Sequence, residues 1–205
     1  MEITDIKQRR FQPAVDAIKD LLEDEEYMDE EVLIIAIDGR SGSGKTTLAD
    51  FLAKQFDANV FHMDDFFLQS HQRTEERLSE VGGNVDYERF REEVLIPLWY
   101  GDPVSYRPFS CKIMEIDKDK EQTIKPKRIN IVEGSYSQHP YFGEPYQLRV
   151  FLDIDEESQL ENISARTGGD NEIMEKFRNE WIPKEEEYIK ANDLEEKADV
   201  YISWN

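Results

Sequence analysis

The stretch Val32–Phe56, VLIIAIDGRSGSGKTTLADFLAKQF, determines how the rest of the sequence is interpreted. It opens with six consecutive apolar residues, Val32–Ile37, which is typical of a strand buried on both faces of a parallel sheet. Asp38 and Gly39 interrupt this run, and Thr47–Phe56 has the pattern of a helix. The order of strand, glycine-rich loop and helix predicts an α/β fold.

The loop fits a phosphate-binding motif, in which two glycines five positions apart are followed by Lys and by Ser or Thr. Glycine allows positive φ angles, so that successive backbone N–H groups can converge on an anion at the positive end of the next helix. Lys45 adds a full positive charge, and the hydroxyl of Thr46 can coordinate Mg²⁺. We therefore expect a nucleoside triphosphate to be held by Gly39, Arg40, Ser41, Gly42, Ser43, Gly44, Lys45, Thr46 and Thr47.

The composition favours one soluble domain. The 205 residues are 39% hydrophobic, which is enough for a single core, and no repeat or low-complexity linker divides them. A single cysteine, Cys111, excludes a disulfide framework and fits a reducing compartment. Because the N-terminal stretch has no long apolar segment, we expect a cytoplasmic protein without a membrane partner.

The formal charge of −21, from 46 acidic and 25 basic residues, argues against nucleic acid as the main partner. Many acids fall in runs such as LLEDEEYMDEE and PKEEEYIKANDLEEK, which we interpret as solvated helix faces. Nucleotide binding is compatible with this charge, because Mg²⁺ and the phosphate loop set the local potential. The sequence leaves the oligomeric state open and allows a homo-oligomer.

Strand and helix patterns alternate along the chain and predict a three-layer α/β/α fold around a parallel sheet. Within 1–31 we expect an amphipathic helix outside the sheet, within 102–128 an inserted β-hairpin, and at 166–172 a break between two helices of a lid. The whole chain, 1–205, is expected to form a single domain. The expected helices are 11–29, 47–56, 86–101, 156–166 and 171–189, and the expected strands are 32–37, 58–63, 129–134, 148–155 and 198–204.

In such a sheet, ligands bind in a cleft beyond the carboxyl ends of the strands. Asp64 is the first carboxylate after the second strand and can accept a proton from a substrate hydroxyl. Glu133 follows the apolar run INIV, at the position where nucleotide-binding folds have a magnesium-associated acid. Arg166 precedes a Gly-Gly break and can close over the phosphates, and Arg178 can share that task.

Some further residues lie in loops or inserted strands that are expected to border the acceptor site. These are Asp86, Tyr87, Arg107 and Tyr136. A structural role and a ligand contact remain open for each. The three histidines, at positions 62, 71 and 139, lack metal-ligand spacing, and we interpret them as bystanders.

Together these motifs resemble the uridine kinase branch of the P-loop nucleoside kinases over about Leu33–Ile202. GRSGSGKTT resembles the phosphate loop of that family, HMDDFF its Asp-x-Phe-Tyr/Phe segment, GGNVDYERF its sugar-binding segment and IVEG its Glu-Gly step. The resemblance implies that Asp64 is the base for the acceptor hydroxyl and that Asp86 holds sugar hydroxyls. It also implies that Glu133 is the Glu of the Glu-Gly step and that Arg166 is the lid arginine.

The sequence also departs from uridine kinases. The positions before Arg166 are Asn162, Ile163, Ser164 and Ala165, where that family usually has a further arginine. In the inserted hairpin, RPFSCK has Phe109 and Ser110 where uridine kinases have a Tyr-Asp pair that helps to enclose the base.

The resulting hypothesis is a kinase that uses Mg²⁺ and ATP or GTP to phosphorylate a hydroxyl of a small molecule, with uridine or cytidine as the first acceptor. Other members of the resembled family leave nicotinamide riboside, pantothenate and sugar phosphates open. A non-catalytic nucleotide-binding regulatory module is the alternative from a different class. A guanine-selecting Asn-Lys-x-Asp motif is absent from the sequence, which disfavours a GTP-dependent switch.

Overall fold

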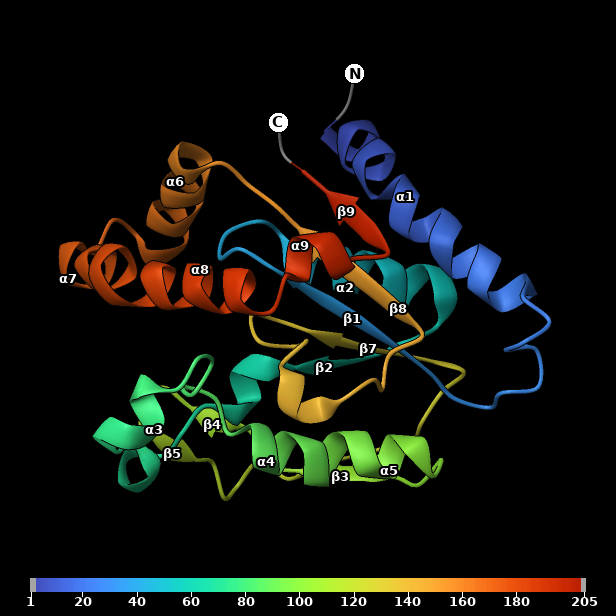
Figure 1. Cartoon of the computed structure of the whole chain (residues 1–205), viewed down its shortest axis with the longest axis horizontal. Helices are drawn as coiled ribbons and strands as arrows, with labels where there is room; N and C mark the ends of the chain where they lie inside the picture. Colours follow the sequence, from blue (N-terminus) through green and yellow to red (C-terminus); the bar gives the residue numbers. More distant parts are fainter. Residues whose placement is uncertain (1–2, 204–205) are drawn as a thin grey trace.

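The computed structural model describes residues 3–203, with side chains from residue 9 onward. Its centre is a five-stranded parallel sheet in the order β2-β7-β1-β8-β9. Helices cover both faces of this sheet, so the predicted three-layer α/β/α fold is confirmed (Figure 1). The strands are β1 (Leu33–Gly39), β2 (Asn59–His62), β7 (Ile129–Glu133), β8 (Leu148–Leu152) and β9 (Val200–Ile202).

The strand register determines which residues meet at the carboxyl edge of the sheet. In the pairing of β1 with β7, Ile37 lies opposite Glu133, and in the pairing of β1 with β8, Gly39 lies opposite Leu152. His62, the last residue of β2, is paired with Glu133. The phosphate loop, the end of β2 and the end of β7 therefore share one edge.

Two helical layers enclose the sheet. α1 (Ile3–Glu23) and α2 (Lys45–Phe56) pack on one face, and α4 (Tyr87–Phe90) and α5 (Ile96–Trp99) pack on the other (Figure 1). A π-helical turn, Arg91–Leu95, joins α4 to α5 in one continuous stretch. Pro97 follows it and has no N–H to donate to an earlier carbonyl, which accounts for the widened turn.

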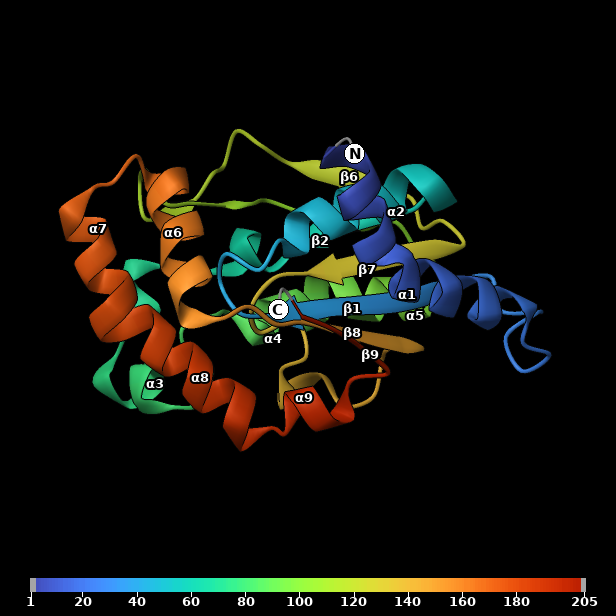
Figure 2. The same ribbon diagram turned by 90° about the horizontal axis from the view of Figure 1, so that it is seen from above.

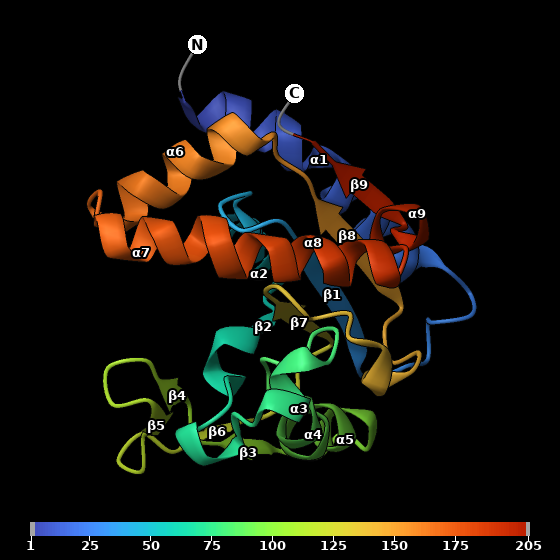
Figure 3. The same ribbon diagram turned by 60° about the vertical axis from the view of Figure 1, so that its left-hand side comes forward.

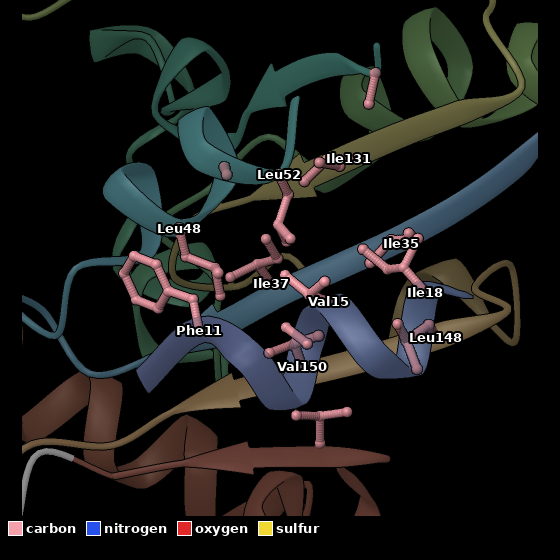
Figure 4. Packing of buried hydrophobic residues seen from close by; sticks show 14 of the residues in the cluster. Phe11, Val15, Ile18, Ile35, Ile37, Leu48, Leu52, Ile131, Leu148 and Val150 are labelled. Atoms are coloured by element: carbon pink, nitrogen blue, oxygen red, sulfur yellow. The ribbon is translucent and has the colours of Figure 1, made fainter. Parts of the chain in front are cut away.

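The core confirms that β1 is buried on both faces. Phe11, Val15 and Ile18 recur at helical spacing along α1 and point toward the sheet (Figure 4). They pack in one cluster with Ile35 and Ile37 of β1. Ile34, directly before Ile35 in the sequence, belongs to the cluster on the opposite face.

Some element boundaries differ from the prediction. β1 continues beyond Ile37 through Gly39, because these last residues also pair with β8. The first helix ends at Glu23 instead of residue 29, and the acidic segment Asp24–Asp29 forms turns. Those carboxylates would lie at the negative end of the helix, which disfavours its continuation. Trp204, expected in the last strand, lies outside the described residues.

Residues 104–124 form an insertion of two small antiparallel sheets. The outer pair joins β3 (Val104–Tyr106) to β6 (Gln122–Ile124), and the inner pair joins β4 (Phe109–Ser110) to β5 (Glu115–Ile116). The predicted single hairpin is therefore a nested pair, since the outer and inner strand pairs have separate ladders.

The lid helices gather at the carboxyl end of β1 (Figures 1 and 2). They are α6 (Glu156–Thr167), α7 (Asn171–Lys176) and α8 (Ile182–Ala191), and a π-helical turn, Phe177–Trp181, joins the last two. Two further short α-helices are α3 (Glu75–Ser79) and α9 (Leu194–Lys197). Within residues 3–203, no helix has the length and apolar character needed to cross a membrane.

Candidate active site

The loop between β1 and α2 requires glycine at two positions. Gly39 has a φ of +139°, and a Cβ at this position would lie 2.0 Å from the carbonyl oxygen of Leu152 in the neighbouring strand. Gly44, with a φ of +95°, is the last residue before α2. Because the helix begins at Lys45, the unpaired N–H groups of its first turn face the loop. The backbone thus has the form of an anion-binding turn.

The side chain of Lys45 folds back onto this turn. Its ammonium group donates hydrogen bonds to the carbonyl oxygens of Gly39 at 2.6 Å and Arg40 at 3.0 Å, and the side chain is buried. An ammonium group has three donors, so a further donor remains for a phosphate oxygen.

Glu133 connects β7 to both neighbouring segments. The hydroxyl of Thr46 lies 3.2 Å from each of its carboxylate oxygens, and Nδ1 of His62 lies 2.5 Å from Oε1. The hydrogen bond to Glu133 raises the pKa of His62. We interpreted His62 as a bystander from the sequence, where its only signal was its place two residues before Asp64; the structure places it against Glu133.

Thr46 and Glu133 fit a magnesium site. Neighbouring ligands of an octahedral Mg²⁺, each about 2.1 Å from the metal, lie about 3 Å apart. The 3.2 Å separation between the Thr46 hydroxyl and the Glu133 carboxylate is close to this value. Within the described part of the chain, no group of three or more His, Cys, Asp and Glu side chains has metal-binding geometry. A metal at this pair would take its other ligands from water and phosphate, as Mg²⁺ commonly does.

Asp64 lies in the short 3₁₀ turn that follows β2, and its side chain is exposed to solvent. The surrounding protein atoms nevertheless displace enough water to raise the pKa of its carboxyl group, and the charge of Glu133 adds to this rise. The positive charges of Lys45, Arg166 and His62 act in the opposite direction. The fold therefore brings these groups, from four separate segments, within electrostatic reach of Asp64.

The adjacent acid, Asp65, is in a different environment. Its carboxylate accepts a hydrogen bond from the hydroxyl of Tyr106 at 3.0 Å, and its carbonyl oxygen accepts one from Arg89 at 2.6 Å. Asp65 is thus tied to the insertion and to the α4 segment, whereas no hydrogen-bond partner of the Asp64 carboxylate occurs among residues 9–203.

The two lid arginines lie in different places. Arg166 is in the last turn of α6, with its guanidinium carbon 5.6 Å from the centroid of the Phe177 ring, and it is one of the charges that act on Asp64. Arg178 lines a shallow hollow between α6 and α7, together with Ser164 and Met174.

Asp86 and Tyr136 are both buried. The carboxylate of Asp86 caps α4 by accepting a hydrogen bond from the Arg89 N–H at 3.1 Å, and it accepts another from the Gln72 amide at 2.7 Å. The ring of Tyr136 packs against Tyr188 of α8, with 4.7 Å between the ring centroids. Burial raises the pKa of the Tyr136 hydroxyl, so this group is a neutral donor.

Tyr87 and Arg107 are engaged elsewhere. The hydroxyl of Tyr87 donates to Glu80 at 2.7 Å, and its ring stacks on His139 at 4.3 Å. Arg107 forms an ion pair with Glu121 at 2.9 Å on the exposed insertion. Neither side chain forms a hydrogen bond or ion pair with Asp64 among the described residues, and their role in acceptor binding stays a prediction.

Sequence reasoning missed Asp38, which lies directly before the phosphate loop. Its carboxylate is 1% exposed and accepts hydrogen bonds from the N–H groups of Gly39 at 2.7 Å and Gln138 at 3.1 Å, and from the Tyr188 hydroxyl at 2.8 Å. Burial raises the pKa of Asp38 to about 6. The available signal was an acid at the end of an apolar run, beside the motif.

The acidic run of α8 was also misinterpreted at one position. Glu185 is 3% exposed and faces the phosphate loop, whereas Glu187 is exposed as expected. Helical spacing could have shown this, because Glu185 shares a face with the buried residues Tyr188 and Ile189.

The strand order and the glycine-rich loop between β1 and α2 define a three-layer α/β/α fold of the P-loop NTPase type. No protein-family model matches the sequence, and no curated protein sequence matches it. Among solved structures, the chain is similar to a possible uridine kinase from Bacillus stearothermophilus. The TM-score is 0.68 and the identity 20%, over 95% of this chain and 98% of that chain.

Two further structures support the same fold. YFH7 from Saccharomyces cerevisiae, a P-loop-containing protein with a circular permutation, has a TM-score of 0.68 and 15% identity over 95% of this chain and 99% of that chain. D-glycerate 3-kinase from Cryptococcus neoformans has a TM-score of 0.58 and 18% identity over 86% of this chain and 87% of that chain. At these identities the likeness establishes the fold.

Proposed function

We propose that this chain is a kinase that transfers the γ-phosphoryl group of ATP or GTP to a hydroxyl of a small molecule. The environment of Asp64 carries this proposal: a solvent-exposed carboxylate lies near the cations Lys45 and Arg166, next to the Thr46–Glu133 pair. A proton acceptor opposite a phosphate-binding turn is the arrangement that phosphoryl transfer needs.

Each residue has a distinct task in the proposed reaction. The phosphate loop holds the triphosphate, with Lys45 between the β- and γ-phosphates, and Mg²⁺ at Thr46 and Glu133 would neutralise phosphate charge. Asp64 takes the proton of the acceptor hydroxyl while that oxygen bonds to the γ-phosphorus. The bond from phosphorus to the bridging oxygen breaks, and the nucleoside diphosphate leaves. Arg166 stabilises the negative charge on the moving group.

A nucleoside such as uridine or cytidine is our first candidate for the acceptor. The likeness to a possible uridine kinase over nearly the whole chain supports it, as does the buried acid Asp86, whose N–H donates to Phe66 in the turn that carries Asp64 and Asp65. The likeness to D-glycerate 3-kinase supports a sugar acid as an alternative. The other candidate acceptors are nicotinamide riboside, pantothenate and sugar phosphates.

An acceptor screen tests the proposal. Purified protein is incubated with Mg·ATP or Mg·GTP and one acceptor at a time, and the nucleoside diphosphate released is compared with release in the absence of acceptor. A strong increase with one chemical class identifies the acceptor. Equal release with and without every acceptor contradicts transfer and favours the non-catalytic nucleotide-binding module.

Asp64→Asn tests the role of the base directly. We expect turnover to fall by about 100-fold or more, with ADP affinity changed by less than about threefold, because the proton acceptor is needed only during transfer. Asp65→Asn is the matched control, since its carboxylate is held by Tyr106. A turnover of Asp64→Asn equal to that of the wild type would remove Asp64 from the reaction.

A further inference from the structure

One face of α8 contacts the start of the phosphate loop. Figure 3 shows α8 passing across β1 at the end where this loop begins. Glu186 forms a bidentate ion pair with Arg40, at 2.6 and 2.9 Å. Two residues further on, the Tyr188 hydroxyl donates to Asp38. The helix is therefore attached to the loop on both sides of Gly39.

Glu185 makes the most unusual of these contacts. Its carboxylate accepts hydrogen bonds from the Ser41 N–H at 2.7 Å, from the Ser41 hydroxyl at 2.9 Å and from the Ser135 hydroxyl. Ser41 belongs to the phosphate loop, and Ser135 lies two residues after Glu133. A single buried side chain thus connects the loop that carries Thr46 to the turn that follows Glu133.

A buried carboxylate is costly unless donors surround it, and here the donors come from two loops that follow the neighbouring strands β1 and β7. If this position only had to be filled, an apolar residue of similar size would serve equally well. The loops at issue are those that bring the Thr46 hydroxyl within 3.2 Å of Glu133. Movement of either loop would change this separation.

We propose that Glu185 is a positioning residue, which holds the phosphate loop and the turn after β7 in a fixed relation so that Thr46 and Glu133 stay paired. Its effect on catalysis rests on the proposed kinase function. Its effect on the loops and on Mg²⁺-dependent nucleotide binding does not. The residue acts through Ser41 and Ser135 and contacts no reacting atom.

The sequence offers a matched pair of variants on one helix. Glu185→Gln keeps the size of the side chain, but it removes the negative charge and replaces one acceptor oxygen by an amide donor. Glu187→Gln makes the same change of charge at an exposed position two residues away. Ser135→Ala removes one donor from the turn after β7 and leaves both Ser41 contacts in place.

Three measurements are made on each variant: the Mg²⁺ concentration for half-maximal Mg·ADP binding, the turnover and KM of transfer, and hydrogen exchange of residues 39–47 and 133–137. For Glu185→Gln we expect about a 10- to 100-fold rise in the Mg²⁺ concentration for half-maximal Mg·ADP binding, or a fall of the same size in kcat, as for other outer-shell partners of a metal site. We expect ADP affinity without Mg²⁺ to change by less than about threefold, since the phosphate-binding turn itself remains. Exchange should quicken at these two segments, and Glu187→Gln should match the wild type.

Two results would overturn the proposal. One is a folded Glu185→Gln protein with wild-type Mg²⁺ dependence and wild-type exchange at both segments. The other is faster exchange throughout the chain with unchanged kcat per folded molecule, which would mean that Glu185 only stabilises the fold. If Glu185→Gln does not fold, Ser135→Ala decides, because it should shift the Mg²⁺ requirement and local exchange in the same direction. If the wild type transfers no phosphoryl group, the proposed function fails, and ADP binding and exchange still test Glu185.

Discussion

The buried acid Asp38 should make the stability of this protein depend on pH in an unusual direction. An unfolded Asp has a pKa of about 3.9. Burial raises the pKa of Asp38 to about 6 in the folded chain. Between about pH 4 and about pH 6 the folded state keeps a proton that the unfolded chain has released, so that rising pH through this window lowers the free energy of unfolding. With about 1.4 kcal/mol for each pH unit, the loss amounts to about 3 kcal/mol.

Asp38→Asn isolates this contribution, because the amide is neutral at every pH. Urea unfolding of both proteins is followed from about pH 4 to about pH 7, and the difference between their free energies of unfolding is plotted, so that the titration of other groups cancels. The wild type should lose about 3 kcal/mol relative to the variant across this range. Tyr188→Phe should enlarge this loss of unfolding free energy. The Tyr188 hydrogen bond lowers the pKa of Asp38, so its removal should raise that pKa further. A difference that is constant with pH would refute the reasoning.

Further predictions concern the groups around Asp64. His62→Gln removes the contact with Glu133, and it should raise the Mg²⁺ concentration for half-maximal Mg·ADP binding about 10-fold in calorimetry; an unchanged Mg²⁺ requirement would contradict its role. Arg166→Ala removes a positive charge that lowers the pKa of Asp64, so the acid limb of the pH profile of kcat/KM should move to higher pH. Because the same charge would stabilise the moving phosphoryl group, kcat should fall about 100-fold. An acid limb that moved to lower pH would be inconsistent with this geometry. Burial, and after it the charge of Asp64, raises the pKa of the exposed Cys111 thiol. Asp64→Asn should therefore speed the alkylation of Cys111 about two- to threefold near neutral pH. Equal alkylation rates in the variant and the wild type would show that the two groups do not interact.

The fold could be predicted because its signals are local. The apolar run Val32–Ile37, the glycine motif and the alternation of strands and helices each depend on neighbouring residues. The boundaries that differ depend on distant partners: β1 extends to Gly39 because β8 lies beside it, and the nested strand pairs of the insertion depend on pairings across a long turn. Such pairings leave little trace in a single sequence.

The residues of the candidate site also divide into those that local sequence indicated and those that tertiary contacts place. The phosphate loop lies within one motif, and Asp64 and Glu133 each follow an apolar strand, so that sequence position alone indicated them. His62 and Glu185 take their places from tertiary contacts. His62 meets Glu133 because β2 pairs with β7 instead of β1, and Glu185 faces the loop because α8 crosses this end of the sheet (Figure 3).

The carboxylates at this edge differ in their surroundings far more than in their chemistry, and this difference separates their roles. Asp38 is enclosed by three donors and is held as part of the fold. Glu133 is paired with Thr46 and His62, at the site proposed for Mg²⁺. Asp64 is exposed, and its charge is balanced by Lys45, Arg166 and His62 without a hydrogen bond to its carboxylate among the described residues. A base must exchange its proton with a substrate, and of these acids Asp64 is the one whose oxygens are open to do so.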